Sequence, residues 1–220
     1  GAPEREEWGM RPYTVNAYYN PLNNEIVLPA AILTVPAYAG DGLDDAVLYG
    51  YIATTIGHEI THGFDDSGRR FSATGRMENG WTEATEKAFT ARCAKLIEQY
   101  DREEPLKGIH INGKQTLSEN IADNTGVRIA LYALIEQLAA SPPPPLIDGF
   151  TPQQRFFLSW AQTWCEQASP ESMRRRAQED VHAPNRWRTN GVLQNLDEFR
   201  AAFGCQPGTP MAPLRACRVW

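Results

Sequence analysis

The sequence predicts a mainly helical fold with a small β-sheet. Apolar residues recur at helical spacing in several long segments, and β-favouring residues flank a turn near the N-terminus. The 220 residues are 42% apolar and 22% charged, which is typical of a globular protein and excludes disordered or collagen-like chains. There is no internal repeat or composition break, so residues 1–220 are expected to form one domain.

The first elements are expected to be two short strands. Residues 15–19 (VNAYY) and 25–28 (EIVL) favour β-structure, and the turn-forming NPLNN at 20–24 separates them. Pro29 should close the second strand, because proline has no N–H for a sheet ladder. This pattern predicts a hairpin or two edge strands.

Helices are expected to follow. One should begin near Asp44 and end near Gly63, and a second should cover residues 82–100. A third should run over 118–139 with Ser118 as its N-cap. Four prolines at 142–145 indicate a stiff loop, a helix with several aromatic residues should follow, and the tail from 180 should be loop-rich with one short helix near 196–203. The apolar stripes of the first and third helices are Leu48, Ile52, Ile56 and Ile60, and Val127, Leu131, Leu134, Ile135 and Leu138.

Charge and composition exclude several classes of protein. The formal net charge of −6 argues against a nucleic-acid partner, which would favour a basic face. No apolar run approaches the ~18 residues of a membrane-spanning helix, and residues 1–7 lack the apolar region of a signal peptide. The four cysteines form no C-x-x-C pair; they are either reduced thiols or long-range disulfides of an exported protein.

The motif that carries chemistry is His58-Glu59-Ile60-Thr61-His62. Two histidines four residues apart project from one side of a helix, within reach of a single ion. Zn²⁺ favours such nitrogen ligands, and its catalytic sites keep one open position. Glu59 is placed to act on metal-bound water. The alternative is a pair of helix histidines satisfied by hydrogen bonds.

A second pair supports this interpretation. Glu119 and Asp123 are also four residues apart, on a separate predicted helix. One carboxylate can be the third ligand, and the other can orient a ligand histidine. Asp65, three residues after His62, is another candidate for that orienting role. Solvated carboxylates are the ordinary alternative for all three.

The sequence resembles the neprilysin and endothelin-converting-enzyme family of zinc metallopeptidases. The matching blocks occur in the same order over almost the whole chain. They are VNAYY at 15–19, IVLPA at 26–30, GHEITHGFDD at 57–66, ENIAD at 119–123, FFLSWAQ at 156–162, DVHAP at 180–184 and CRVW at 217–220.

The resemblance implies a thermolysin-like zincin (gluzincin) domain that hydrolyses peptide bonds of oligopeptides. His58, His62 and Glu119 would bind one Zn²⁺, and Glu59 would be the general base that activates the zinc-bound water. The remaining roles also follow from the resemblance. Asp123 and Asp65 would orient the ligand histidines, His182 would stabilise the oxyanion, Arg188 would bind a substrate carbonyl, and Asn16 and Ala17 would pair with the substrate backbone on an edge strand. Trp164 is expected in the core, with the border of the substrate pocket as the alternative.

Partners and location are implied in the same way. Family members carry a helical N-terminal region that covers the active site, so this chain would need that region or a companion chain. Cys93 would bond Cys217, while Cys165 and Cys205 would bond cysteines in that region, pair with each other or stay reduced. The location would be extracytoplasmic: secreted, periplasmic or an ectodomain. The family often has an aromatic residue at the position of Ala37. The smaller alanine side chain would enlarge a substrate pocket there.

Two other readings remain open from the sequence. The chain could be an inactive scaffold that binds zinc and its N-terminal partner, although Glu59, His182 and Arg188 would then have no catalytic use. It could also be a hydrolase of the thermolysin kind. The block at 180–188 and the closing CRVW argue against that second possibility.

Overall fold

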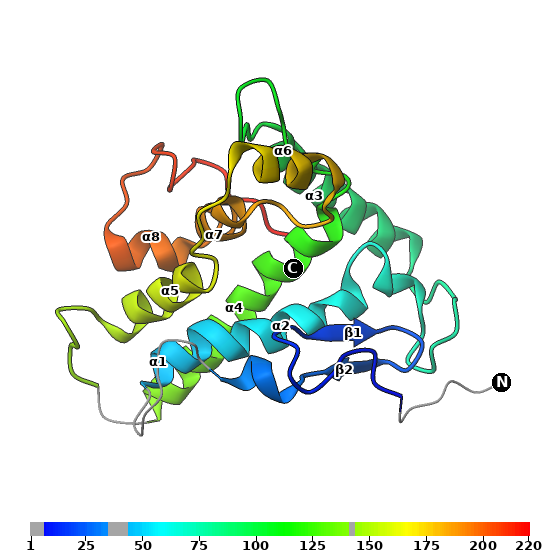
Figure 1. Cartoon of the computed structure of the whole chain (residues 1–220), viewed down its shortest axis with the longest axis horizontal. Helices are drawn as coiled ribbons and strands as arrows, with labels where there is room; N and C mark the ends of the chain where they lie inside the picture. Colours follow the sequence, from blue (N-terminus) through cyan, green and yellow to red (C-terminus); the bar gives the residue numbers. More distant parts are fainter. Residues whose placement is uncertain (1–6, 35–43, 141–143) are drawn as a thin grey trace.

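The computed structural model describes residues 7–34, 44–140 and 144–220, and there the chain is mainly helical with one small sheet (Figure 1). This confirms the predicted fold class. Ala37 and the first two prolines of the run lie outside the described residues. The elements are β1 (Tyr18–Asn20), β2 (Glu25–Val27), η1 (Ala30–Leu33), α1 (Asp45–Leu48), η2 (Tyr49–Ala53), α2 (Thr54–Thr61), η3 (His62–Phe64), η4 (Gly68–Arg70), α3 (Glu83–Asp101), α4 (Leu117–Ala139), α5 (Pro152–Thr163), α6 (Pro170–Glu179), α7 (Asn185–Leu193) and α8 (Asp197–Phe203).

The predicted hairpin is present but shorter than expected. β1 and β2 pair in antiparallel register, with Tyr19 opposite Ile26. Asn24 adopts a left-handed backbone conformation in the connecting turn, which asparagine tolerates better than most residues. Residues 15–17 precede the strand rather than belonging to it. The sheet lies against α2, where it forms one wall of the cavity described below.

The helix expected from Asp44 to Gly63 has four parts, the last of which is the short 3-10 turn η3. α1 leads into the π-helical turn η2, which leads directly into α2. The predicted buried stripe is wrong: Leu48, Ile52 and Ile56 are only half-buried, and Ile60 is 44% exposed. A π turn interrupts the 3.6-residue period, so residues counted in fours do not stay on one face.

Glycines make the closest contacts of this helical segment. A Cβ on Gly50 would lie 2.3 Å from the Phe156 carbonyl oxygen of α5. A Cβ on Gly57 would lie 2.7 Å from the Gly126 carbonyl oxygen, and one on Gly126 would lie 2.5 Å from the His58 amide nitrogen. The backbones of α2 and α4 therefore touch directly beside the first histidine of the motif, which explains why the two helices run side by side through the centre (Figure 1).

Gly57→Ala is expected to destabilise the protein. Alanine favours a helix over glycine by about 1 kcal/mol, but overpacking a tight contact costs about 1–3 kcal/mol, and here the obstacle is backbone. We expect the free energy of unfolding to fall by about 1–2 kcal/mol, measured by urea denaturation. Gly80→Ala is the control, because a Cβ there has no neighbour within 4 Å; equal stability of the two variants would contradict the interpretation.

The third predicted helix is confirmed as α4, but two details differ. Thr116 occupies the N-cap position, and Ser118 lies inside the first turn, where its hydroxyl is directed to another element. Val127, Leu131 and Leu134 are fully buried as expected, whereas Ile135 is 37% exposed. The helix lies between two cores, so its buried residues do not form a single narrow stripe.

The remaining helices agree in part with the sequence. α3, α5 and α8 confirm the predicted segments, with Trp164 as the C-cap of α5. α6 and α7 were not predicted, and α7 lies in the tail from 180 that was expected to be loop-rich. Ser169 caps α6 ahead of Pro170, a combination that is a typical helix start. α7 has only the weaker signal of Pro184 at its N-cap.

Two apolar cores hold these helices together. One packs α4, α5 and α7 around Phe156, Phe157 and Trp160; the other packs α3, the start of α4 and α7 around Tyr100 and Trp187. α4 contributes to both, so the residues at its first turns have a rigid position between them. No helix in the described part of the chain is long and apolar enough to cross a bilayer.

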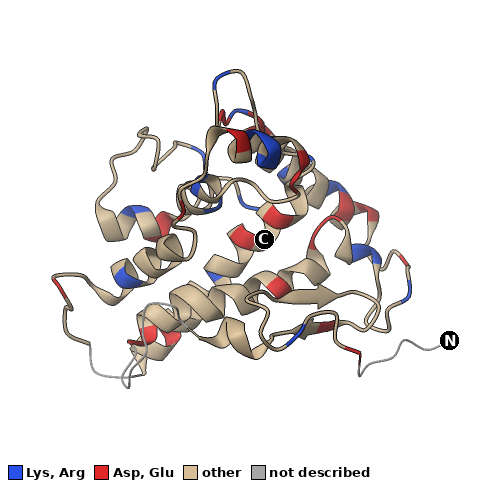
Figure 2. Cartoon of the chain, viewed as in Figure 1, with Lys and Arg blue, Asp and Glu red and all other residues tan. Residues whose placement is uncertain are grey.

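Charged residues are interspersed over the outer helices (Figure 2). Residues 174–176 (three arginines) lie on α6, where two of them are exposed and Arg176 pairs with Glu166, so this is a solvated face.

The expected disulfide between Cys93 and Cys217 is not formed in the structure, where all four cysteines are free thiols. Cys93 of α3 is buried in the apolar core around Tyr100 and Trp187. The Cys217 sulfur donates to the Lys95 carbonyl oxygen at 3.4 Å. Burial raises the pKa of the Cys93 thiol to about 12, which keeps it protonated and unreactive.

Candidate active site

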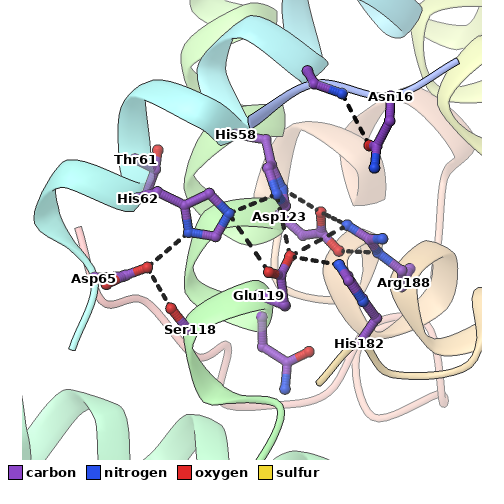
Figure 3. A network of polar contacts seen from close by, with 12 residues as sticks. Asn16, His58, Thr61, His62, Asp65, Ser118, Glu119, Asp123, His182 and Arg188 are labelled. Atoms are coloured by element: carbon purple, nitrogen blue, oxygen red, sulfur yellow. Dashed lines mark hydrogen bonds and ion pairs between the residues drawn. The ribbon is translucent and has the colours of Figure 1, made fainter. Parts of the chain in front are cut away.

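Two helices bring the predicted ligand residues together. α2 and the following turn carry His58 and His62, and the first turn of α4 carries Glu119. The Nε2 atoms of the two histidines lie 3.0 Å apart. Glu119 Oε2 lies 3.2 Å from His58 Nε2, and Glu119 Oε1 lies 3.6 Å from His62 Nε2 (Figure 3). Three donor groups from two helices therefore face one point.

These distances fit a zinc ion. Zinc–ligand bonds of about 2.0–2.1 Å at tetrahedral angles place neighbouring donor atoms about 3.3 Å apart. The Glu119 Oε2 atom is buried and accepts no hydrogen bond of regular geometry, although ring nitrogens surround it. Two imidazoles and one carboxylate are also a typical donor set of catalytic zinc sites.

A carboxylate contacts the Nδ1 atom of each predicted ligand histidine. His58 Nδ1 lies 2.8 Å from Asp123 Oδ1, and His62 Nδ1 lies 2.7 Å from Asp65 Oδ2. These contacts keep the proton on Nδ1 and leave Nε2 free to coordinate, as in carboxylate–histidine–zinc arrangements. Asp123 and Asp65 are 1% and 2% exposed, so both orienting groups are rigidly enclosed.

His182 also faces Glu119. Its Nε2 lies 3.2 Å from Glu119 Oε2, and its Nδ1 lies 2.8 Å from Asp180 Oδ1. Asp180 was not among the residues predicted for the site. The signal was available: an aspartate two residues before a histidine can bond both its ring and its backbone N–H, as Asp180 does here.

Arg188 is buried beside this cluster. Its Nε and Nη2 donate to the two Asp123 oxygens at 2.7 and 2.8 Å. Its guanidinium lies 3.8 Å from the centre of a Trp164 ring, a close cation–π contact. Asp123 therefore holds both His58 and Arg188, and this shared carboxylate fixes their relative positions.

The electrostatic environment favours a cation. Burial by itself lowers the pKa of His58, but hydrogen bonds with Asp123 and Glu119 outweigh it and raise the pKa to about 9. The carboxylates that stabilise an imidazolium here would also stabilise a metal cation, which on binding would displace the Nε2 proton. Glu59 lies within 4.8 Å of both histidines, and burial raises the pKa of its carboxyl above the ordinary value. That shift suits a group that accepts and returns a proton.

All the predicted site residues line one cavity of about 910 Å³. Asn16 and Ala17 line it from the segment just before β1, and the Ala17 N–H donates to Asn16 Oδ1 at 2.9 Å. The expectation that both lie within the strand is therefore wrong, although they precede it directly. Trp164 borders the cavity and is also partly buried against the apolar core, so both of its expected places apply.

Together, the fold and the site define a chain of the zinc-peptidase class, with two histidines one helical turn apart and a carboxylate from a second helix. The profile of peptidase family M13 matches residues 16–219, and the chain belongs to this family.

Individual relatives agree with this assignment. The chain is 41% identical to an endothelin-converting enzyme homolog of Locusta migratoria over 98% of its own length and 30% of the relative's. It is 41% identical to human endothelin-converting enzyme 1 over its whole length and 28% of that protein. Its structure superposes on Mycobacterium tuberculosis zinc metalloprotease Zmp1 in complex with inhibitor with a TM-score of 0.93 and 42% identity, over 99% of this chain and 34% of that one. The chain thus spans about a third of its relatives' length.

Proposed function

We propose that residues 1–220 form the catalytic domain of a zinc-dependent endopeptidase that hydrolyses peptide bonds of oligopeptides. The observation that carries the proposal is the meeting of His58, His62 and Glu119 at one point, with Glu59 buried beside them. Membership of family M13 and the similarity to endothelin-converting enzyme 1 and Zmp1 support it.

Each side chain of the site has a role in this proposal. His58, His62 and Glu119 hold Zn²⁺, which when bound polarises the scissile carbonyl and acidifies the attacking water. Glu59 accepts the proton of that water and passes it to the leaving amine. His182, oriented by Asp180, donates to the oxygen on which negative charge develops.

Binding of the peptide falls to residues around the cavity. Arg188 has two of its nitrogens bound to Asp123, which leaves Nη1 to donate to a substrate carbonyl. Asn16 and Ala17 offer backbone and amide groups beside the first strand, so they can pair with an extended substrate backbone. Contacts of this kind recognise the main chain of the substrate rather than its side chains, which suits a peptidase that accepts varied sequences.

Glu119→Ala is expected to remove zinc from the site. The variant loses one of three protein ligands, so we expect the zinc Kd to rise more than 100-fold, beyond the 10- to 100-fold typical of losing a hydrogen-bond partner of a ligand. Chelator competition followed by metal analysis measures this, with Glu98→Gln on the exposed face of α3 as the control. Unchanged zinc affinity in Glu119→Ala would contradict the proposed ligand set.

The proposal includes a partner and a location. We propose that a helical region of the same protein, or a companion chain, covers part of this domain. An apolar hollow of about 440 Å³ supports this: its lining includes the exposed side chains Ile60, Phe64, Ile129 and Tyr132. We also propose an extracytoplasmic location, on the basis of the family resemblance. The protein would be secreted, periplasmic or part of an ectodomain.

A further inference from the structure

Ser118 has a hydroxyl that the mechanism does not use. It lies in the first turn of α4, directly before Glu119, but it does not cap that helix. Instead, its Oγ donates to Asp65 Oδ2, the same oxygen that lies 2.7 Å from His62 Nδ1 (Figure 3). A chain of contacts therefore links α4 to His62 through one carboxylate.

The other contacts of Asp65 are local. Its Oδ1 accepts from the backbone N–H groups of Ser67 and Gly68 at 2.8 and 2.6 Å. The turn is tight, because a Cβ on Gly68 would lie 1.8 Å from the His62 carbonyl oxygen. Among the described residues, Ser118 is thus the only hydrogen-bond donor to Asp65 that comes from outside its own turn.

The two ligand histidines are tied to α4 in different ways. His58 is held by Asp123, which is itself part of α4. His62 is held at Nδ1 by Asp65, which is not part of α4, so the link from Nδ1 to α4 passes through the Ser118 hydroxyl. Glu119 also belongs to α4. The Ser118 bond therefore couples the far side of the His62 ring to α4, in addition to the direct 3.6 Å approach of Glu119 Oε1 to His62 Nε2.

We propose that Ser118 is a positioning residue for zinc: its hydroxyl holds Asp65 and thereby sets the His62 ring against Glu119. The inference rests on the zinc site of the proposed function. Without the hydroxyl, Asp65 Oδ2 keeps His62 as its donor but loses its tie to α4, and the ring can drift from the carboxylate 3.6 Å away. Direct partners of ligands contribute 10- to 100-fold to metal affinity, so a group one bond further out should contribute about 3- to 10-fold.

The experiment compares four forms of the 220-residue chain: the parent, Ser118→Ala, Ser118→Thr and Ser159→Ala. Thr restores the hydroxyl, and Ser159 is the matched control, because it lines the same cavity but donates to the Val47 carbonyl. Zinc Kd is measured by chelator competition. The visible spectrum of the Co²⁺ form reports ligand geometry, and thermal unfolding of the metal-free protein reports damage to the fold.

We expect Ser118→Ala to raise the zinc Kd about 3- to 10-fold and to shift the Co²⁺ bands. Ser118→Thr and Ser159→Ala should stay within about twofold of the parent. A zinc Kd for Ser118→Ala within twofold of the parent would overturn the proposal. So would equal losses in the Ala and Thr variants that track the thermal unfolding of the metal-free protein. A parent that binds no zinc would overturn the proposed function as well, so the two failures are distinguishable.

Discussion

Glu59→Gln is expected to lower kcat/KM for a peptide substrate by about 10²- to 10⁴-fold, because a general base contributes rate enhancement of that order. Glutamine has nearly the same shape but cannot accept the proton of the attacking water. Zinc should stay bound, because the proposed ligands are His58, His62 and Glu119. A fluorogenic oligopeptide gives the rate, and metal analysis of the same sample gives the zinc content.

The zinc content of this variant decides between two assignments. Glu59 also lies within 4.8 Å of both histidines, so distance alone allows it to be a ligand. Glu119 lies 3.2 and 3.6 Å from the two ring nitrogens, which is the spacing of donor atoms around one zinc ion and favours it as the third donor. Loss of zinc from Glu59→Gln would reverse the two roles. If Glu59→Gln kept full activity with zinc bound, Glu59 would not be the general base. If the parent bound zinc but had no activity, the inactive scaffold would be favoured.

Asp123→Asn is expected to reduce the free energy of unfolding by about 3–5 kcal/mol, the usual cost of leaving one member of a buried ion pair alone. Asp123 is fully buried and receives two hydrogen bonds from Arg188. Although burial opposes the charge, Arg188 and His58 hold the pKa of this carboxyl below its ordinary value. The nearest other carboxylate to Arg188 is Glu119, at 3.9 Å. Urea denaturation of the metal-free protein measures the loss.

A second substitution separates charge from shape. In Asp123→Asn/Arg188→Met the unpaired cation is removed, so most of the lost stability should return, while zinc affinity should stay low because His58 still lacks its carboxylate. Asp66→Asn is the matched control. Burial and Asp65 raise the pKa of the Asp66 carboxyl, so its neutralisation should cost no stability. Equal losses in Asp66→Asn and Asp123→Asn would contradict the argument.

Errors in the fold prediction occurred at residues whose packing neighbours cannot be inferred from the spacing of apolar residues or from residue type. Ile60 has the spacing of a core residue and is exposed, whereas Gly57 has no apolar side chain and forms the tightest contact between α2 and α4. Ser118 is a typical helix cap by residue type, but Thr116 occupies that position. The π turn before α2 disturbed the spacing that predicted Ile60, whereas tertiary contacts decided the places of Gly57 and Ser118.

The sequence by itself determined the pairs at helical spacing, His58 with His62 and Glu119 with Asp123, because backbone geometry alone puts residues four apart on one face. It also carried the family resemblance. Only the tertiary structure decided that the two helices meet through Gly57 and Gly126, that Ser118 donates to Asp65, and that Trp164 packs on Arg188. Those contacts depend on how close packing brings distant segments together, and no local spacing encodes that closeness.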